Sequence, residues 1–150
     1  MTSGEGDKLC LGNQLCFPLY ACAKEVTRKY RKPLARLNLT YTQYVVMMVL
    51  WEFGSMTEGA LGKKVHLDYS TLAPLLKRLE KTGYIDRTRP DDNERQLVIS
   101  LTPEGRKLRQ KALKVPDEMR GCIDLSEEEL IQLKYLLDKA LNNMDQEKYN

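Results

Sequence analysis

Apolar residues recur at helical spacing over most of the chain and alternate over one short stretch. The first predicted helix has Asn13 as its N-cap, which makes Cys16 its third residue, and ends at Pro33 and residues 38–40. Its apolar stripe contains Leu15, Leu19, Val26 and Tyr30. A second helix, over residues 42–53, is apolar almost all round, so we expect it in the middle of a core.

The rest of the chain alternates short helices with one hairpin. A short helix is predicted over residues 57–64 and another over 70–82, where Pro74 favours a start at Ser70 or Thr71 and Gly83 ends the helix. Strands are predicted over residues 84–88 and 96–101, joined by the polar loop 89–95.

Two later helices have clear starts in the sequence. Thr102 caps one helix and Pro103 takes its first position, whereas Ser126 and Glu129 form a capping box for the last helix. The last helix carries leucines at helical spacing: Leu130, Leu133, Leu136, Leu137 and Leu141.

This order of elements predicts a mainly α fold with a small β-hairpin, a winged helix-turn-helix. We expect one domain over residues 1–150. Residues 42–101 form its winged helix, and the leucine-bearing helices over 13–37 and 103–148 flank it.

The middle of the chain has residues that suit DNA. The helix over 70–82 begins with small hydroxyl residues and continues with cations, and the hairpin adds arginines that suit a narrow minor groove. The same residues also fit an ordinary solvated face, and the acids of loop 89–95 could hold the arginines in ion pairs instead. The candidate DNA-binding residues are Ser70, Thr71, Pro74, Lys77, Arg78, Arg87, Arg89 and Arg95.

Composition narrows the class of protein. A chain of 150 residues with 42% hydrophobic and 30% charged residues has enough apolar surface for a folded core. No apolar run is long enough to cross a bilayer and the first residues do not resemble a secretory signal, so we expect a soluble, cytoplasmic protein without a membrane partner. The net charge of +3 is too small to indicate a partner by itself.

The cysteines do not suggest a metal site. Cys10, Cys16, Cys22 and Cys122 contain no pair at zinc-ligand spacing, and His66 is the single histidine. We therefore expect reduced thiols and no metal or other cofactor.

Cys16 lies where a thiol becomes reactive. A cysteine in the first turn of a helix faces unpaired N–H groups and the positive end of the helix dipole, which favour the thiolate. A thiolate can reduce a peroxide and become a sulfenic acid. The alternative is that Cys16 is only a small core residue.

Several segments together resemble the MarR family of winged helix-turn-helix repressors, and more narrowly its subgroup of thiol-based organic-hydroperoxide sensors. They are NQLCF (13–17), LTYTQY (39–44), LDYSTLAPLLKRLE (67–80), NER (93–95) and ISLT (99–102). The chain departs from the subgroup at Thr42, where proline is usual, at Tyr69-Ser70, where Ser-Gly is usual, and at Asn93, which commonly is an aspartate that braces Arg95. The resemblance implies a homodimeric transcriptional repressor, not an enzyme, that binds a pseudo-palindromic site in double-stranded DNA and releases it when organic hydroperoxide oxidises Cys16.

The resemblance also implies that Tyr30 and Tyr41 donate hydrogen bonds to Cys16. Tyr30 follows Cys16 by fourteen residues, which is about 21 Å along a straight helix. The two side chains can meet only if the tyrosines come from a second subunit, so the sensing hypothesis requires a dimer. Alternatively, both rings are ordinary packing residues.

Cys122 is the candidate resolving thiol, by a loose match to two-cysteine members of the subgroup. Cys10, Cys22 or a small cellular thiol could serve instead.

Two other functions remain open at this stage. A repressor of this family could be released by a small aromatic ligand, with the cysteines incidental. A thiol peroxidase is disfavoured, because no proline-threonine-cysteine arrangement surrounds Cys16.

Overall fold

The computed structural model describes residues 8–147, and it describes side chains as far as residue 145. These residues form two compact units, which divide between Met119 and Arg120 and are described here separately. The predicted last helix was expected to end at residue 148, which lies outside the described range.

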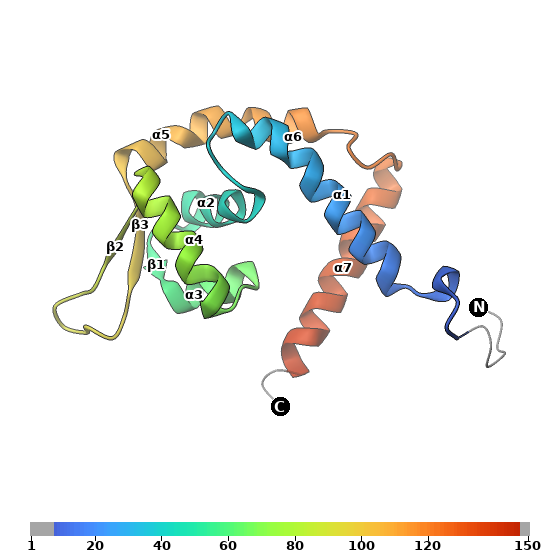
Figure 1. Ribbon diagram of the computed structural model, residues 1–150, viewed down its shortest axis with the longest axis horizontal. Helices are drawn as coiled ribbons and strands as arrows, with labels where there is room; N and C mark the ends of the chain where they lie inside the picture. The colour runs from blue at the N-terminus through green and yellow to red at the C-terminus, as the bar shows by residue number, and fades with distance from the viewer. Residues whose placement is uncertain (1–7, 148–150) are drawn as a thin grey trace. The chain divides into compact units, whose positions relative to one another are not determined.

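The first unit is helical apart from three short strands (Figure 1). In chain order its elements are the 3-10 helix η2 (Leu11–Asn13), α1 (Cys16–Ala35), α2 (Tyr41–Phe53), β1 (Met56–Thr57), α3 (Glu58–Val65), α4 (Tyr69–Thr82), β2 (Ile85–Thr88), β3 (Val98–Leu101), α5 (Pro103–Ala112) and α6 (Lys114–Met119).

The strands form an antiparallel sheet in the order β1-β3-β2. In the β2–β3 hairpin Ile85 pairs with Leu101 and Thr88 with Val98, whereas Met56 of β1 pairs with Ile99. The predicted winged helix-turn-helix is therefore confirmed, with α3 and α4 as the two helices and the hairpin as the wing. The prediction missed β1, because two residues are too few to show alternation.

Side-chain caps define most helix starts. Thr40 and Gln43 form a capping box at α2, and Thr57 accepts from Ala60 N at α3. The predicted cap at Thr102 is confirmed, because its hydroxyl accepts from Gly105 N at 3.0 Å.

The start of α1 differs from the prediction. Asn13 is the last residue of η2, and the N-cap position of α1 is Leu15, which has a helical conformation and makes no side-chain cap. Gln14 instead donates hydrogen bonds to the carbonyls of Lys8 and Cys10 and closes this turn on itself. Cys16 is consequently the first residue of α1 and not the third.

Two prolines differ from the prediction in their place within a helix. Pro33 was expected to end the first helix, and Pro74 was expected to lie close to the start of the helix over 70–82. α4 begins at Tyr69, which makes Pro74 its sixth residue, because the Asp68 cap sets the start. α1 runs through Pro33 to Ala35. Each proline removes only one helical hydrogen bond, and both helices bury leucines that keep them in place.

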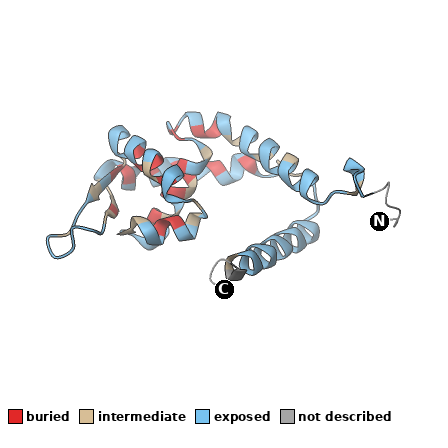
Figure 2. Cartoon of the chain, turned by 60° about the horizontal axis from the view of Figure 1, so that its bottom comes forward, coloured by how far each residue is buried: buried red, intermediate tan, exposed pale blue. Residues whose placement is uncertain are grey.

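The core gathers around α2 and the inner face of α4, as the buried segments in Figure 2 show. The expectation that the second helix lies in the middle of a core is confirmed, since Val46, Met47 and Leu50 are almost wholly buried. Residues from other elements complete it: Leu34, Leu61, Leu72, Leu76, Leu79, Ile85 and Ile99.

The second unit consists of a short lead and α7 (Glu127–Glu147). The predicted capping box is confirmed, because Glu129 N donates to Ser126 Oγ and Ser126 N donates to the Glu129 carboxylate. α7 leaves a row of large apolar side chains exposed: Leu130, Ile131, Leu133, Tyr135, Leu136, Leu137, Leu141 and Met144. No helix within residues 8–147 is long and apolar enough to span a membrane.

One junction attaches the sheet to the helices above it. Trp51 Nε1 donates to Gly105 O at 2.9 Å, and the Tyr84 hydroxyl donates to Leu37 O at 2.9 Å. Burial raises the pKa of the Tyr84 phenol. Gly105 fits because a Cβ there would lie 2.0 Å from Tyr84 O, so only glycine allows α5 to approach the end of the sheet.

We expect Gly105→Ala to lower the free energy of unfolding by about 1–3 kcal/mol, because the added methyl forces α5 away from Tyr84. Urea denaturation measures this change. Gly59→Ala in α3 is the matched control, since a Cβ there meets nothing within 4 Å, and it should change stability by less than about 1 kcal/mol. Equal effects of the two substitutions would contradict this account.

Candidate functional site

The outward face of α4 carries the predicted polar residues. Leu72, Leu75, Leu76 and Leu79 are buried along one side of the helix, which leaves the opposite side to solvent. The exposed residues include five of the eight predicted DNA-binding residues: Ser70, Thr71, Pro74, Lys77 and Arg78. The structure thus brings these five residues onto one exposed helix surface.

Asp68 fixes the start of this helix. Its carboxylate accepts hydrogen bonds from Thr71 N at 2.9 Å and from the Ser70 hydroxyl at 3.0 Å. The hydrogen bonds from Thr71 and Ser70 hold the pKa of Asp68 below its usual value, because they favour the ionised form. The cap therefore also orients Ser70, one of the predicted contact residues.

The three predicted wing arginines have different surroundings. Arg87 in β2 is only 20% exposed and pairs with Glu80 of α4, with 3.2 Å between Nη2 and Oε1. Arg89 donates from Nη1 to Glu94 O at 2.9 Å. Arg95 is exposed, and its guanidinium has no hydrogen-bond or ion-pair partner among residues 8–145.

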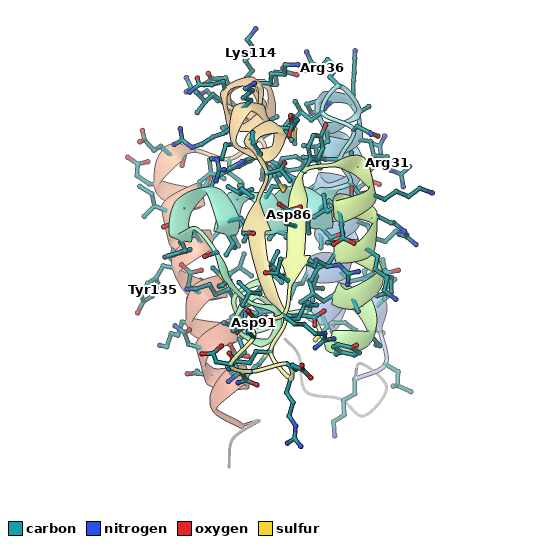
Figure 3. All side chains as sticks on the ribbon, turned by 90° about the vertical axis from the view of Figure 1, so that its left-hand side faces the viewer. Arg31, Arg36, Asp86, Asp91, Lys114 and Tyr135 are labelled. Carbon is teal, nitrogen blue, oxygen red and sulfur yellow. The ribbon has the colours of Figure 1, made fainter. Side chains whose placement is uncertain are left out.

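The acidic loop residues do not restrain these arginines through ion pairs. Within the described residues, the carboxylates of Asp91, Asp92 and Glu94 form no salt bridge with Arg87, Arg89 or Arg95. Figure 3 shows Asp86 on the hairpin and Asp91 in the loop beyond it. Within the described residues, no carboxylate of the loop therefore braces Arg95 in place of the aspartate that is usual at position 93.

Cys16 is exposed at the first position of α1. Exposed apolar side chains surround it along the chain: Leu15, Phe17, Leu19 and Tyr20. The alternative that Cys16 is a core residue therefore does not hold within this single chain. An exposed thiol among unburied apolar side chains is typical of a surface that another molecule covers.

The two predicted tyrosine partners lie together, away from Cys16 along the chain. The rings of Tyr30 in α1 and Tyr41 in α2 are 4.8 Å apart between centroids. Because Cys16 and Tyr30 belong to the same continuous helix α1, the separation of about 21 Å expected for fourteen helical residues applies.

The sequence reasoning did not assign Tyr44 and Trp51 to this cluster. The Tyr44 ring lies 6.0 Å from Tyr30 and 6.4 Å from Trp51, which extends the pair into a row of aromatic rings. Burial, and secondarily Tyr41, raises the pKa of Tyr44. The spacing of residues 41, 44 and 51 places their rings near one another on one helix and could have predicted this row. The same spacing is equally typical of core packing.

The four cysteines are divided between the two units. Cys10, Cys16 and Cys22 belong to the first unit and Cys122 to the second, and none of them is in a disulfide. Within the described residues, no three His, Cys, Asp or Glu side chains converge to hold a metal ion.

A hollow of about 260 Å³ lies between α2 and the α5–α6 segment. Its lining combines aromatic and apolar side chains with one acid and one base: Tyr44, Met48, Trp51, Glu52, Arg109, Ala112, Leu113 and Pro116.

Comparison with known proteins gives one family and many relatives. The family model described as "Transcriptional regulator SarA/Rot" matches residues 28–112. The organic hydroperoxide resistance transcriptional regulator of Bacillus subtilis is 42% identical over 140 residues, which are 93% of this chain and 95% of that protein. The regulator SarZ of Staphylococcus saprophyticus is 39% identical over 88% of this chain and 90% of its own length.

Solved structures show the same architecture. Reduced AbfR bound to DNA superposes with a TM-score of 0.79 at 31% identity, covering 95% of this chain and 98% of that one. MarR superposes with a TM-score of 0.73 at 22% identity, over 88% of this chain and 98% of that one, which shows a shared fold.

The Asp68 cap should make the stability of the first unit depend on pH. The pKa of Asp68 is lower in the folded state than its ordinary value of 3.8. The ionised cap therefore contributes its full stabilisation above pH 3.8, and this stabilisation is lost as the pH falls through the pKa of the folded state. At neutral pH we expect Asp68→Ala to lower the Tm by about 2–4 °C.

Asp68→Asn is the matched control, because its side-chain oxygen still caps the helix without the charge. Its Tm should approach that of the wild type as the pH is lowered below 3.8 in thermal scans. An Asp68→Ala protein with an unchanged Tm at neutral pH would rule out the cap as a stabilising contact.

Proposed function

The chain belongs to the SarA/Rot family of transcriptional regulators, and we propose that it is a homodimeric, thiol-based repressor that releases DNA when organic hydroperoxide oxidises Cys16. Its winged helix-turn-helix agrees with that membership.

One observation supports the DNA-reading role most directly, namely the division of α4 into a buried leucine side and an exposed polar side. An exposed helix of this kind can enter the major groove, with Ser70, Thr71 and Pro74 near base edges and Lys77 and Arg78 near phosphates. AbfR, which shares the fold at 31% identity, has been solved with DNA bound.

The wing adds contacts beside α4. Arg89 and Arg95 lie at the two ends of the wing loop, beside the sugar–phosphate backbone that borders the adjacent minor groove, where arginine is favoured electrostatically. Arg87 contributes by holding the wing against α4 through Glu80.

The exposed apolar faces support the proposal of a dimer. The N-terminal part of α1 and the whole of α7 leave large apolar side chains uncovered, and monomeric proteins rarely expose such continuous patches. We assign dimerisation to residues 13–37 and 103–148 and DNA reading to residues 42–101. A two-fold dimer then reads a pseudo-palindromic site with half-sites about 34 Å apart.

The dimer also completes the sensing site. Cys16 cannot reach Tyr30 of its own α1, so an antiparallel α1 of the partner subunit brings Tyr30 and Tyr41 to it. Their hydroxyls donate hydrogen bonds to the Cys16 thiolate and orient it.

The chemistry of sensing is a two-electron oxidation. The Cys16 thiolate attacks the terminal OH oxygen of the hydroperoxide, the O–O bond breaks, and the sulfur becomes a sulfenic acid, while the alkoxide that leaves takes a proton from water and becomes the alcohol. A second thiol then forms a disulfide with loss of water. Cys122 is the candidate resolving thiol, with Cys10, Cys22 or a small cellular thiol as alternatives.

Oxidation changes the volume and polarity of a packed site between subunits. Such a change biases the dimer toward a spacing of the two recognition helices that no longer matches the DNA grooves. AbfR has been solved in a reduced and an overoxidized form, both bound to DNA, and in a disulfide form.

The hollow beside Trp51 supports a second candidate, a regulator released by a small aromatic ligand. Its aromatic walls and Arg109 would suit an aromatic carboxylate. In that case a Cys16→Ser protein would still release DNA on addition of the ligand, and the wild type would ignore hydroperoxide.

We expect Cys16→Ser to bind DNA as the reduced wild type does and to stay bound when organic hydroperoxide is added, because serine cannot form a sulfenic acid. The measurement is fluorescence anisotropy of the protein's own upstream DNA, combined with mass analysis of the residue. The wild type, treated with hydroperoxide in the same way, is the control and should release DNA. Release that persists in Cys16→Ser excludes Cys16 as the switch.

Lys77→Ala should weaken binding to all DNA sequences alike and reduce the slope of log affinity against log salt by about one for each bound subunit, if Lys77 contacts a phosphate. Titrations at several salt concentrations measure this slope. Lys107→Ala, an exposed lysine on α5, is the control. An effect confined to particular base pairs would assign Lys77 to base readout instead.

A further inference from the structure

A polar hollow of about 390 Å³ lies where the wing meets the helix-turn-helix. Three parts of the chain line it: the start of α3, the first residue of α4 and the two ends of the wing loop. The lining residues are Thr57, Glu58, Gly59, Tyr69, Arg89, Arg95, Gln96 and Leu97.

Tyr69 is the unusual member of this set. It is the first residue of α4, and 73% of it is exposed, although an aromatic ring at a solvent surface leaves much apolar area in water. Its hydroxyl makes no hydrogen bond to any residue that the structure describes. Tyr69 therefore presents both a ring and an unused hydroxyl to the hollow.

The wing lies on the same flank of α4 as Tyr69. Glu80 follows Tyr69 by eleven residues, which is about three full turns plus 20° at 100° per residue, so both residues lie on one side of the helix. Glu80 accepts a hydrogen bond from Arg87 of β2, which shows that this side faces the wing. Tyr69 consequently points away from the centre of the outward face that carries Ser70 and Lys77.

This position determines which part of a DNA duplex the hollow meets. A winged helix places its recognition helix in the major groove and its wing in the adjacent minor groove. The sugar–phosphate backbone separates the two grooves. A hollow between α4 and the wing therefore faces that backbone and not the base edges.

The charges of the lining favour an anion carried by a larger molecule. Arg89 and Arg95 contribute two positive charges, and Arg95 has no side-chain partner within the described residues. Glu58 contributes one negative charge, and its Oε1 is buried without a hydrogen-bond partner. The negative charge of Glu58 repels a small free anion. A phosphate should therefore bind in the hollow only when it belongs to a DNA duplex that also contacts the protein elsewhere.

We propose that this hollow binds one backbone phosphate of the DNA per subunit, with the Tyr69 hydroxyl donating a hydrogen bond and Arg95 supplying the positive charge. The inference rests on the proposed DNA binding and adds a contact residue that Ser-Gly at positions 69–70 would not provide. A phosphate contact positions the protein without reading sequence. Tyr69 therefore strengthens binding but leaves sequence preference unchanged.

The test compares Tyr69→Phe with the wild type on a duplex selected from random-sequence DNA by the full-length protein. Loss of one hydrogen bond to a charged oxygen should weaken binding about tenfold, equally for the selected duplex and for unrelated DNA. Ser55→Ala removes a hydroxyl from an exposed residue that does not line the hollow, and it is the control.

A methylphosphonate scan then locates the contact, because that substitution removes the charge of a single phosphate. In the wild type one phosphate per half-site should be sensitive, and in Tyr69→Phe the same substitution should cost less than it does in the wild type. Arg95→Gln should reduce sensitivity at the same phosphate.

The outcomes separate this inference from the proposed function. A wild type that binds no duplex overturns both. A wild type that binds DNA with the same affinity as Tyr69→Phe, or a Tyr69→Phe loss restricted to particular base pairs, overturns the phosphate contact alone. Tight binding of inorganic phosphate by the protein without DNA also contradicts it, because Glu58 should prevent this.

Discussion

Burial of one side of α4 is the interaction on which the rest of the structure depends. Leu72, Leu76 and Leu79 are almost completely buried, and about 25 cal/mol for each Å² of apolar surface removed from water makes rotation of this helix unfavourable. The outward face of α4 is therefore fixed by what its inward face contacts. The same constraint decides which flank meets the wing, through the pair between Arg87 and Glu80.

The wing and the upper helices are held by a small number of polar contacts at close approaches. Gly105 lets α5 lie against the end of the sheet, where Trp51 and Tyr84 hydrogen-bond to backbone carbonyls of distant segments. These contacts link α1, α2, the sheet and α5 within the first unit.

The sensing chemistry, in contrast, is incomplete within one chain. Cys16 is exposed at one end of α1, and the tyrosine pair lies at the other end of that helix. Because the length of α1 separates this thiol from the tyrosines, the proposed hydrogen bonds between them need a second subunit, and the exposed apolar sides of α1 and α7 support that proposal. In the proposed dimer, thiol orientation and the spacing of the two recognition helices are properties of the same interface.

The sequence by itself determined the order and type of the larger elements and the family resemblance, because helical periodicity and caps such as Thr102 and Ser126 act locally. It did not determine β1, the first residue of α1, or the continuation of helices through Pro33 and Pro74, since these depend on strand pairing and on buried leucines far along the chain. Only the tertiary structure separated the three wing arginines into a paired Arg87, a restrained Arg89 and an unpaired Arg95. It also brought Tyr69 beside Arg95, because the flank that a helix turns toward its neighbour is set by packing of the whole core and not by local pattern.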